Sequence, residues 1–213
     1  MVFRRNAVAG VLAGALVVTG CGSAGRRCPG PQGPDLSGQT VAGTDLSQRG
    51  LRCAVLEHAQ LDGAEVSDAN LSQADLHGAH MRQARLSHVN LSSADLGGAV
   101  LESAVLQGAD LSGADLHDAS LRAVSLTGVT LIGAQFGDAD LRSAVLAGSD
   151  LSRADLGGAD LSDASLINSN ARGATLDKAS LSGVTWRNVV CPDGSISTRN
   201  AGQSCEGHLT PAP

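Results

Sequence analysis

Imidazole and hydroxyl side chains are the groups in this chain that could take part in catalysis, but their spacing does not favour it. Five of the six histidines lie in the body of the chain, at His58, His77, His80, His88 and His117. Serine is abundant, yet neither the G-x-S-x-G nor the S-x-x-K arrangement of serine nucleophiles occurs. The cysteine spacings fit no zinc pattern. We therefore expect no enzyme, no resident metal and no cofactor.

Residues 20–25, Gly-Cys-Gly-Ser-Ala-Gly, formally match the dinucleotide-binding pattern GxGxxG. That pattern needs a strand before it and a helix after it, because the helix N-terminus binds the pyrophosphate. The surrounding sequence predicts neither element. The match therefore does not indicate a nucleotide site.

The N-terminal residues are typical of an export signal. Arg4 and Arg5 precede an apolar run over 7–18, which is too short to span a bilayer. The run ends at Val-Thr-Gly-Cys, which resembles a bacterial lipobox. We predict a lipoprotein signal peptide at 1–20, lipidation of Cys21 and a Gly- and Pro-rich flexible tether at 21–34. The alternative is an ordinary secretory signal with an incidental cysteine, and the choice between general and twin-arginine export stays open.

The rest of the chain is organised by a period of five residues. From Leu36 to Trp186 an apolar or small residue recurs at every fifth position without insertion or deletion. The residue two places earlier is alanine at 21 of the 27 positions from 54 to 184. This period is neither the 3.6 of a helix nor the 2 of a strand, so it predicts a solenoid. Stacked coils bury side chains against one another, which suits a chain with only 1% aromatic residues.

Segments such as Ala-Asp-Leu-Ser-Gly and Ala-Asp-Leu-His-Gly are similar to the A(D/N)LXX consensus of the pentapeptide-repeat family. The resemblance implies an all-β fold, the right-handed quadrilateral β-helix, with four pentapeptides per coil and nearly 8 coils over 35–188. It implies that the central Leu and the Ala two places before it point inward. The first coil departs from the consensus at Pro34, Gln39, Thr44 and Arg49, so we expect it to be imperfect. We expect 189–213 to form a tail that caps the last coil beside Trp186.

Four cysteines remain besides Cys21, and the length of the solenoid limits their pairing. The two ends of nearly eight coils lie about 35 Å apart at strand spacing, whereas disulfide Cα atoms lie within about 7 Å. This predicts Cys28–Cys53 and Cys191–Cys205. Free thiols are the alternative. Disulfides agree with an extracytoplasmic location.

The constant frame places residues 20 apart on one face. Residues 51–186 hold 8 basic and 17 acidic residues, a net charge of −9. We predict that the acid concentrates on two adjoining faces. The possible interaction ridge has Asp75, Asp95, Asp115 and Asp155 on one face and Asn70, Asn90, Asp110, Asp150 and Asn170 on the other. On this frame His77 and His117 lie two coils apart, about 10 Å at strand spacing and too far to share a metal.

These observations favour a non-enzymatic, lipid-anchored envelope protein that acts as a rigid interaction or structural module. The expected partners are the membrane, through lipid on Cys21, and an unknown envelope component; a monomer is expected and no nucleic acid, because the body is acidic and lacks stacking aromatics. Some family members inhibit topoisomerases by imitating DNA, so a gyrase inhibitor is one alternative. A divalent-cation-dependent surface module is another. The simplest interpretation of the Asp and Asn residues is local hydrogen bonding to turns.

Overall fold

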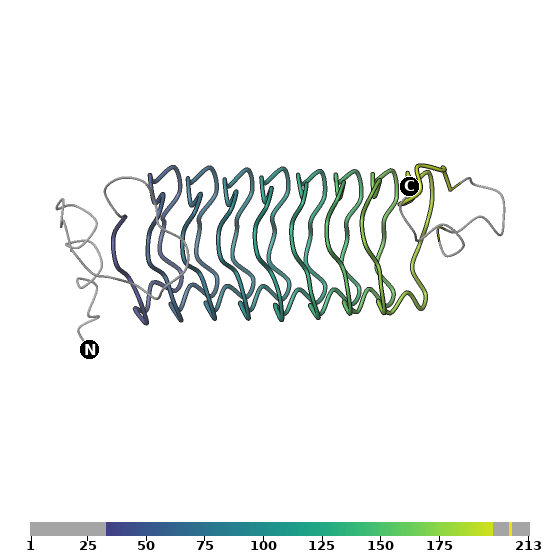
Figure 1. The fold of residues 1–213 in the computed structure, drawn as a ribbon. Coiled ribbons are helices and arrows are strands. Elements are labelled where there is room, and N and C mark those ends of the chain that lie inside the picture. Colours follow the sequence, from purple (N-terminus) through teal and green to yellow (C-terminus); the bar gives the residue numbers. More distant parts are fainter. Residues whose placement is uncertain (1–32, 198–204, 206–213) are drawn as a thin grey trace.

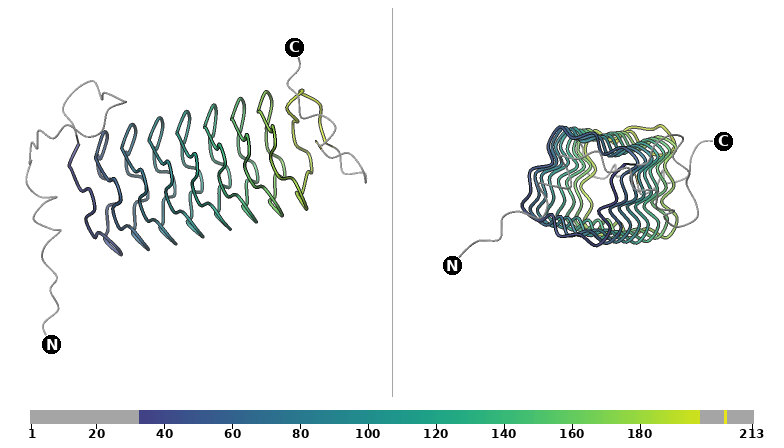
Figure 2. Two further views of the ribbon diagram at one scale, coloured as in Figure 1. Left: turned by 60° about the horizontal axis from the view of Figure 1, so that its bottom comes forward. Right: turned by 90° about the vertical axis from the view of Figure 1, so that its left-hand side faces the viewer.

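The computed structural model describes residues 33–197 and Cys205. The predicted signal peptide (1–20), Cys21, Cys28, most of the predicted tether and most of the tail beyond 197 lie outside the described residues. Coil follows coil along one axis, from the purple to the yellow end of the chain (Figure 1). Viewed along that axis, the coils superpose as a four-sided outline (Figure 2).

Each side of the rod is made by residues that pair with the residues 20 positions later. The parallel β-bridges run without interruption from Asp35↔Val55 to Asn170↔Val190. Each bridge is a single residue, and the described residues contain no α-helix and no strand longer than one bridge. Four pentapeptides therefore form each coil, as the sequence predicts.

Backbone hydrogen bonds connect neighbouring coils on every side. The N–H of Leu96 donates to the carbonyl oxygen of Asp115 at 2.6 Å, and the N–H of Asp115 donates to Ala94 at 2.9 Å. Between successive pentapeptides a turn is closed by the residue three places after the central residue, as where Ala99 N–H donates to Leu96 O at 3.0 Å. The backbone is thus satisfied inside the rod and along its sides.

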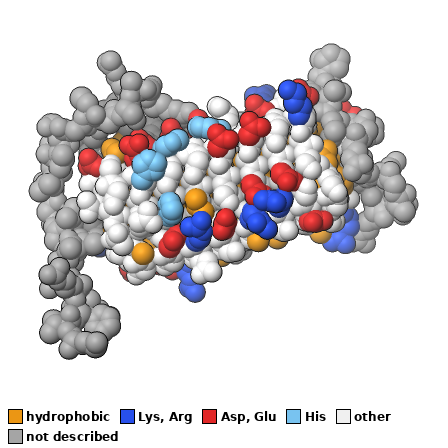
Figure 3. Space-filling model, turned by 90° about the horizontal axis from the view of Figure 1, so that it is seen from below, with side chains coloured by type: hydrophobic (Ala, Val, Ile, Leu, Met, Phe, Trp, Pro, Cys, Tyr) orange, Lys and Arg blue, Asp and Glu red, His pale blue; other side chains and the backbone are white. Residues whose placement is uncertain are grey.

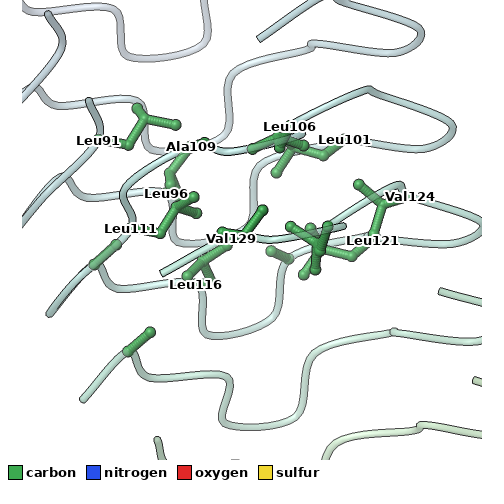
Figure 4. Close-up of a cluster of buried hydrophobic side chains, with 14 of the residues drawn as sticks. Leu91, Leu96, Leu101, Leu106, Ala109, Leu111, Leu116, Leu121, Val124 and Val129 are labelled. Atoms are coloured by element: carbon green, nitrogen blue, oxygen red, sulfur yellow. The ribbon is translucent and has the colours of Figure 1, made fainter. Parts of the chain in front are cut away.

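The interior is a column of the central residues and the alanines. Leu91, Leu111 and Leu131 are completely shielded from solvent. Figure 4 shows leucines of successive coils pointing into the space between the four sides. Phe136 takes the place of one central Leu and is also fully buried. The predicted inward positions are therefore confirmed.

Serine replaces alanine at two inward positions, Ser149 and Ser169, which are both 2% exposed. Each hydroxyl donates to the carbonyl oxygen three residues earlier, of Leu146 and Leu166 respectively, at 2.6 Å. A buried hydroxyl costs little when it has such a partner. The core thus tolerates these serines.

The first coil has the regular backbone of the others, although its sequence departs from the consensus. Its bridges to the second coil are complete from Asp35 to Gly50. The polar residues at its inward positions lie at the open rim, where Gln39 and Arg49 are exposed. The expected imperfection therefore concerns side-chain burial and leaves the coil geometry unchanged.

The C-terminal tail is attached to the last coil by a disulfide and a short antiparallel contact. Cys191 and Cys205 are bonded, with Cα atoms 5.4 Å apart, and both are buried. Val190 forms an antiparallel bridge with Ile196, and Ser197 Oγ accepts the N–H of Val189 at 2.9 Å. The predicted Cys191–Cys205 bond is confirmed. Cys53 is also in a disulfide, and Cys28, the partner predicted for it, lies outside the described residues.

The second turn residue of each pentapeptide has a positive φ, for example 66° at Gly128. A β-carbon in this region costs about 1–2 kcal/mol, so Gly128→Ala should lower the free energy of unfolding by about 1 kcal/mol. Gly137 occupies the preceding turn position without a positive φ, and a β-carbon on either glycine meets no atom within 4 Å. Gly137→Ala is therefore the matched control, with stability unchanged or slightly raised. Urea titration measures both; equal effects would contradict the conformational argument.

Candidate docking face and histidine cluster

The four sides of the rod differ strongly in charge. We name each face after one of its bridge residues. A face consists of the bridge residues that stack 20 positions apart, together with the second and third residues after each of them, which form the turn. On the Asp75 face the described residues carry nine carboxylates and a single cation, Lys178. The nine are Asp35, Glu57, Asp75, Asp95, Asp115, Asp118, Asp138, Asp155 and Asp177.

The adjoining Asn70 face is polar, and its charges balance. Its bridge positions include Asn70, Asn90, Asp110, Asp150 and Asn170, as predicted from the frame. Its turn positions, however, add Arg52, Arg153 and Arg172. The prediction of an acidic ridge over two adjoining faces is therefore wrong in this respect: the negative charge concentrates on the Asp75 face alone. Counting only the residues before each Leu had left out these arginines.

The His80 face, on the other side of the Asp75 face, mixes charges of both signs. Arg82 Nε donates to Glu102 at 3.2 Å, and Arg142 pairs with Asp140 and lies 3.7 Å from Asp160. Seen from below, the rod carries acidic and basic side chains intermingled, with histidines towards one end (Figure 3). Exposed pairs of this kind contribute little stability, about 0–1 kcal/mol each.

The carboxylates of the Asp75 face have a local structural role. Oδ1 of Asp95 accepts the N–H of Gly97 at 3.0 Å, and Oδ1 of Asp155 accepts the N–H of Gly157 at 3.0 Å. The same contact recurs on other faces, where a serine hydroxyl also donates, as Ser112 does to Asp110. Asp and Asn residues at these positions therefore bind the turn backbone, which is the simplest interpretation offered by the sequence.

The contact with the turn needs only an acceptor oxygen, which asparagine has as well as aspartate. Replacing Asp by Asn therefore removes the negative charge and keeps the hydrogen bond. Asp75, Asp95 and Asp115 stack in successive coils, and like charges at this spacing repel by about 1 kcal/mol per pair in water. Asp95→Asn with Asp115→Asn should leave the melting temperature unchanged or raise it. Alanine at both positions should lower it, because the turn acceptor is lost. A marked loss of stability in the asparagine variant would refute repulsion along the stack.

Three histidines gather on the Asp75 face. The ring centroids of His77 and His117 are 6.2 Å apart, and those of His58 and His77 are 6.0 Å apart. From the sequence we expected two coils, about 10 Å, to separate His77 and His117. For their rings this expectation is wrong, because the rings lie closer together than the coils that carry them. Gly97 stands between them without a side chain, so both rings lean over it: a β-carbon there would lie 2.4 Å from Cε1 of His117 and 2.9 Å from Nδ1 of His77.

Carboxylates surround these rings. Nδ1 of His117 and Oδ1 of Asp115 are hydrogen-bonded at 2.7 Å, and Nδ1 of His77 lies 4.0 Å from Oδ1 of Asp95. The hydrogen bond that His117 makes to the Asp115 carboxylate raises the pKa of His117, and the charges of Asp118 and Asp95 act in the same direction. His80 and His88 lie on other faces, where Nδ1 of His88 is 3.7 Å from Oδ1 of Asp68.

The raised pKa of His117 predicts a pH dependence of stability. Its stabilising contribution is fully present below the unfolded pKa of about 6.5 and is lost as pH rises through the higher folded pKa. In buffer with a chelator, the melting temperature should therefore fall from about pH 6 to about pH 8, and His117→Gln should reduce that fall. An identical pH profile in the variant would contradict this assignment.

The described residues contain no group of three or more His, Cys, Asp and Glu side chains placed to hold one metal ion. Among the same residues, no helix combines the length and apolar character needed to cross a bilayer. The most distinctive surface features of the described residues are the acidic Asp75 face and its histidine cluster.

Known proteins that resemble this chain have the same repeat architecture as the one described above. The family model for pentapeptide repeats matches the chain in 8 copies, over residues 50–87, 84–122, 119–158 and 146–183. Among curated proteins no significant match is found.

Two solved structures are informative. One is HetL, a pentapeptide repeat protein involved in heterocyst differentiation regulation from the cyanobacterium Nostoc. It is 33% identical, with a TM-score of 0.66, and the match covers 76% of this chain and 82% of HetL. The other is QnrB1, a plasmid-mediated fluoroquinolone resistance protein, 25% identical with a TM-score of 0.59, covering 71% of this chain and 77% of QnrB1. Together with the family model, the uninterrupted stack of four-sided coils makes this chain a member of the pentapeptide-repeat family.

Proposed function

We propose that this protein is a lipid-anchored, extracytoplasmic scaffold whose Asp75 face docks a basic partner. The anchor and the location rest on the sequence: a positively charged start, an apolar run and a lipobox-like segment that ends at Cys21. Three cysteines in disulfides, Cys53 and the Cys191–Cys205 pair, support an oxidising compartment. The scaffold role is supported by the repeat body, which the pentapeptide-repeat model matches in 8 copies.

The single observation that carries the docking proposal is the segregation of charge. Among the described residues the Asp75 face holds nine carboxylates, one lysine and no arginine, whereas each of the other three faces carries arginines. The backbone of this face is fixed by hydrogen bonds between coils, so its charges are held at regular spacing. A basic partner would bind a preorganised row of charges and would lose little ordering entropy on the side of the rod.

The experiment is crosslinking on intact cells, with a photoreactive residue at Asp115 or at Asp155 and identification of the captured species by mass spectrometry. Val145 is the control position, since it is exposed on the opposite face, which carries few charges. We expect capture of a protein with a basic surface from the two Asp75-face positions and not from Val145. Equal capture from all three positions, or none, would refute docking on this face.

A second candidate is inhibition of a DNA topoisomerase in the cytoplasm through imitation of DNA. The likeness to QnrB1, a fluoroquinolone resistance protein, and the acidic face favour it. Export argues against it, because an extracytoplasmic protein does not meet gyrase. Cell fractionation distinguishes the two: membrane-bound protein that Cys21→Ala releases supports the anchored scaffold, whereas uncleaved protein in the cytoplasm supports the inhibitor.

A further inference from the structure

One row of turn residues on the His80 face has charges of alternating sign. The row consists of the second residue after each bridge residue, so its members stack 20 positions apart. Its charged stretch, which we call the alternating row, is Asp62, Arg82, Glu102 and Arg122. Arg82 Nε donates to Oε2 of Glu102 at 3.2 Å, and Oε1 of Glu102 accepts the Ser120 hydroxyl at 3.1 Å. The two middle side chains are thus held in place, yet they remain 44% and 39% exposed.

The two outer members of the alternating row have charges that the rod does not pair directly. Oδ1 of Asp62 accepts the backbone N–H of Arg82 at 2.7 Å. Arg122 attracts Glu102 and Asp140 through space, but within the described part of the chain neither Asp62 nor Arg122 forms an ion pair. Asp62 and Arg122 lie three coils apart, about 14 Å at strand spacing, so they do not reach each other in one rod.

A second copy packed antiparallel on this face would complete the row. A two-fold axis that lies in the plane of contact and crosses both rods reverses the order of the coils and keeps every residue in its own row. When the axis passes between the coils of Arg82 and Glu102, each of these residues faces the other's equivalent in the second copy. Asp62 then faces Arg122 of the second copy. Because such a contact is isologous, each of these pairs of opposite charge occurs twice.

The other two rows of the His80 face are compatible with the same arrangement, since over these coils they oppose no like charges. The facing residues are Gln60 and Ser120, His80 and Val100, Gly63 and Ala123, and Gln83 and Ser103. The same operation on the Asp75 face would set its stacked carboxylates against one another, and like charges repel. The His80 face is therefore self-complementary, and the Asp75 face is not.

We propose that the His80 face is an interface between two antiparallel copies of this chain, centred between Arg82 and Glu102. Exposed ion pairs add little affinity but determine register and orientation. One flat side of a few coils belongs to the small class of interfaces, below about 1,200 Å², so the dimer is weak and reversible. The two-fold axis leaves both Asp75 faces on the same side of the dimer. Dimerisation thus doubles the acidic surface and replaces the monomer expected from the sequence.

The test is sedimentation equilibrium of the full chain in mild detergent at low salt, over a wide range of protein concentration. We expect a monomer–dimer equilibrium whose Kd rises at least tenfold in Asp62→Arg and in Arg122→Asp, because each change sets like charges opposite each other. Combining the two changes should restore the Kd to within about threefold of the wild type. Arginine and aspartate already occupy this row, so circular dichroism should show all variants folded.

A matched variant separates facing charges from net charge. Asp177 has the same turn position on the Asp75 face, outside the proposed interface. Arg122→Asp with Asp177→Arg restores the net charge of the chain but not the facing pair, and it should stay as weak as Arg122→Asp alone. A monomer at every concentration would overturn the proposal. So would a Kd that neither single change raises, or one that both double variants restore equally.

Discussion

Replacing Leu111 by Asp is expected to abolish the fold of the coils around it. Leu111 is completely buried between Leu91 and Leu131 of the neighbouring coils. Losing a buried leucine side chain costs about 2–5 kcal/mol, and burying a carboxyl group without a partner adds several more. This sum approaches the whole stability of an ordinary domain, about 5–15 kcal/mol. Far-UV circular dichroism and urea titration should show loss of the cooperative transition.

Two variants show whether burial is the cause. Val105→Asp introduces the same carboxylate at a position that is 38% exposed, beside Arg85 in the preceding coil, and should leave the protein folded. Leu111→Met conserves volume and should cost less than about 1.5 kcal/mol. If Leu111→Asp melts like the wild type, the central column is not the source of stability.

Removing the Cys191–Cys205 disulfide is expected to have the second largest effect. Its cysteines are 14 positions apart, and closing a loop of about 15 residues contributes about 3 kcal/mol in the chain-entropy model. Without it, the tail should detach and expose the last coil. Solenoid coils depend mainly on their neighbours, so the damage should begin at this end.

Amide hydrogen exchange on the Cys191→Ser, Cys205→Ser variant tests this directly. The amides of Asn188 and Val189 donate to Ser197 and should lose protection, while that of Leu111, in the middle of the rod, should keep it. Uniform loss of protection along the rod would show that it unfolds as one unit. Unchanged protection at Val189 would show that the tail holds without the bond.

The sequence predicted most of the fold because one constraint repeats without a break. The five-residue period determines which residues point inward, and the absence of insertions determines which residues stack, as the bridge from Asp95 to Asp115 confirms. The pairing of Cys191 with Cys205 followed because the length of the rod excludes bonds between its two ends. These are properties of the backbone, which the pattern specifies directly.

The candidate site was less predictable, because it depends on side chains outside the pattern. The balanced charge of the Asn70 face depends on Arg153 and Arg172 at turn positions, which a count of bridge residues overlooks. The approach of His77 and His117 depends on what is missing at Gly97. Coil spacing gives the distance between two Cα atoms, whereas long side chains lean into any gap between them. A glycine between two histidines in one column was the available signal.

The pairing of every residue with the one 20 positions later restricts how this protein can change its length. Adding or removing a whole coil leaves the carboxylates of Asp75, Asp95 and Asp115 on one line. Inserting a single pentapeptide would preserve the buried core equally well but would turn everything downstream by a quarter of a revolution. The acidic row would then continue on a neighbouring side. For such a rod the unit of evolutionary duplication that preserves a surface is four times the unit that preserves the fold.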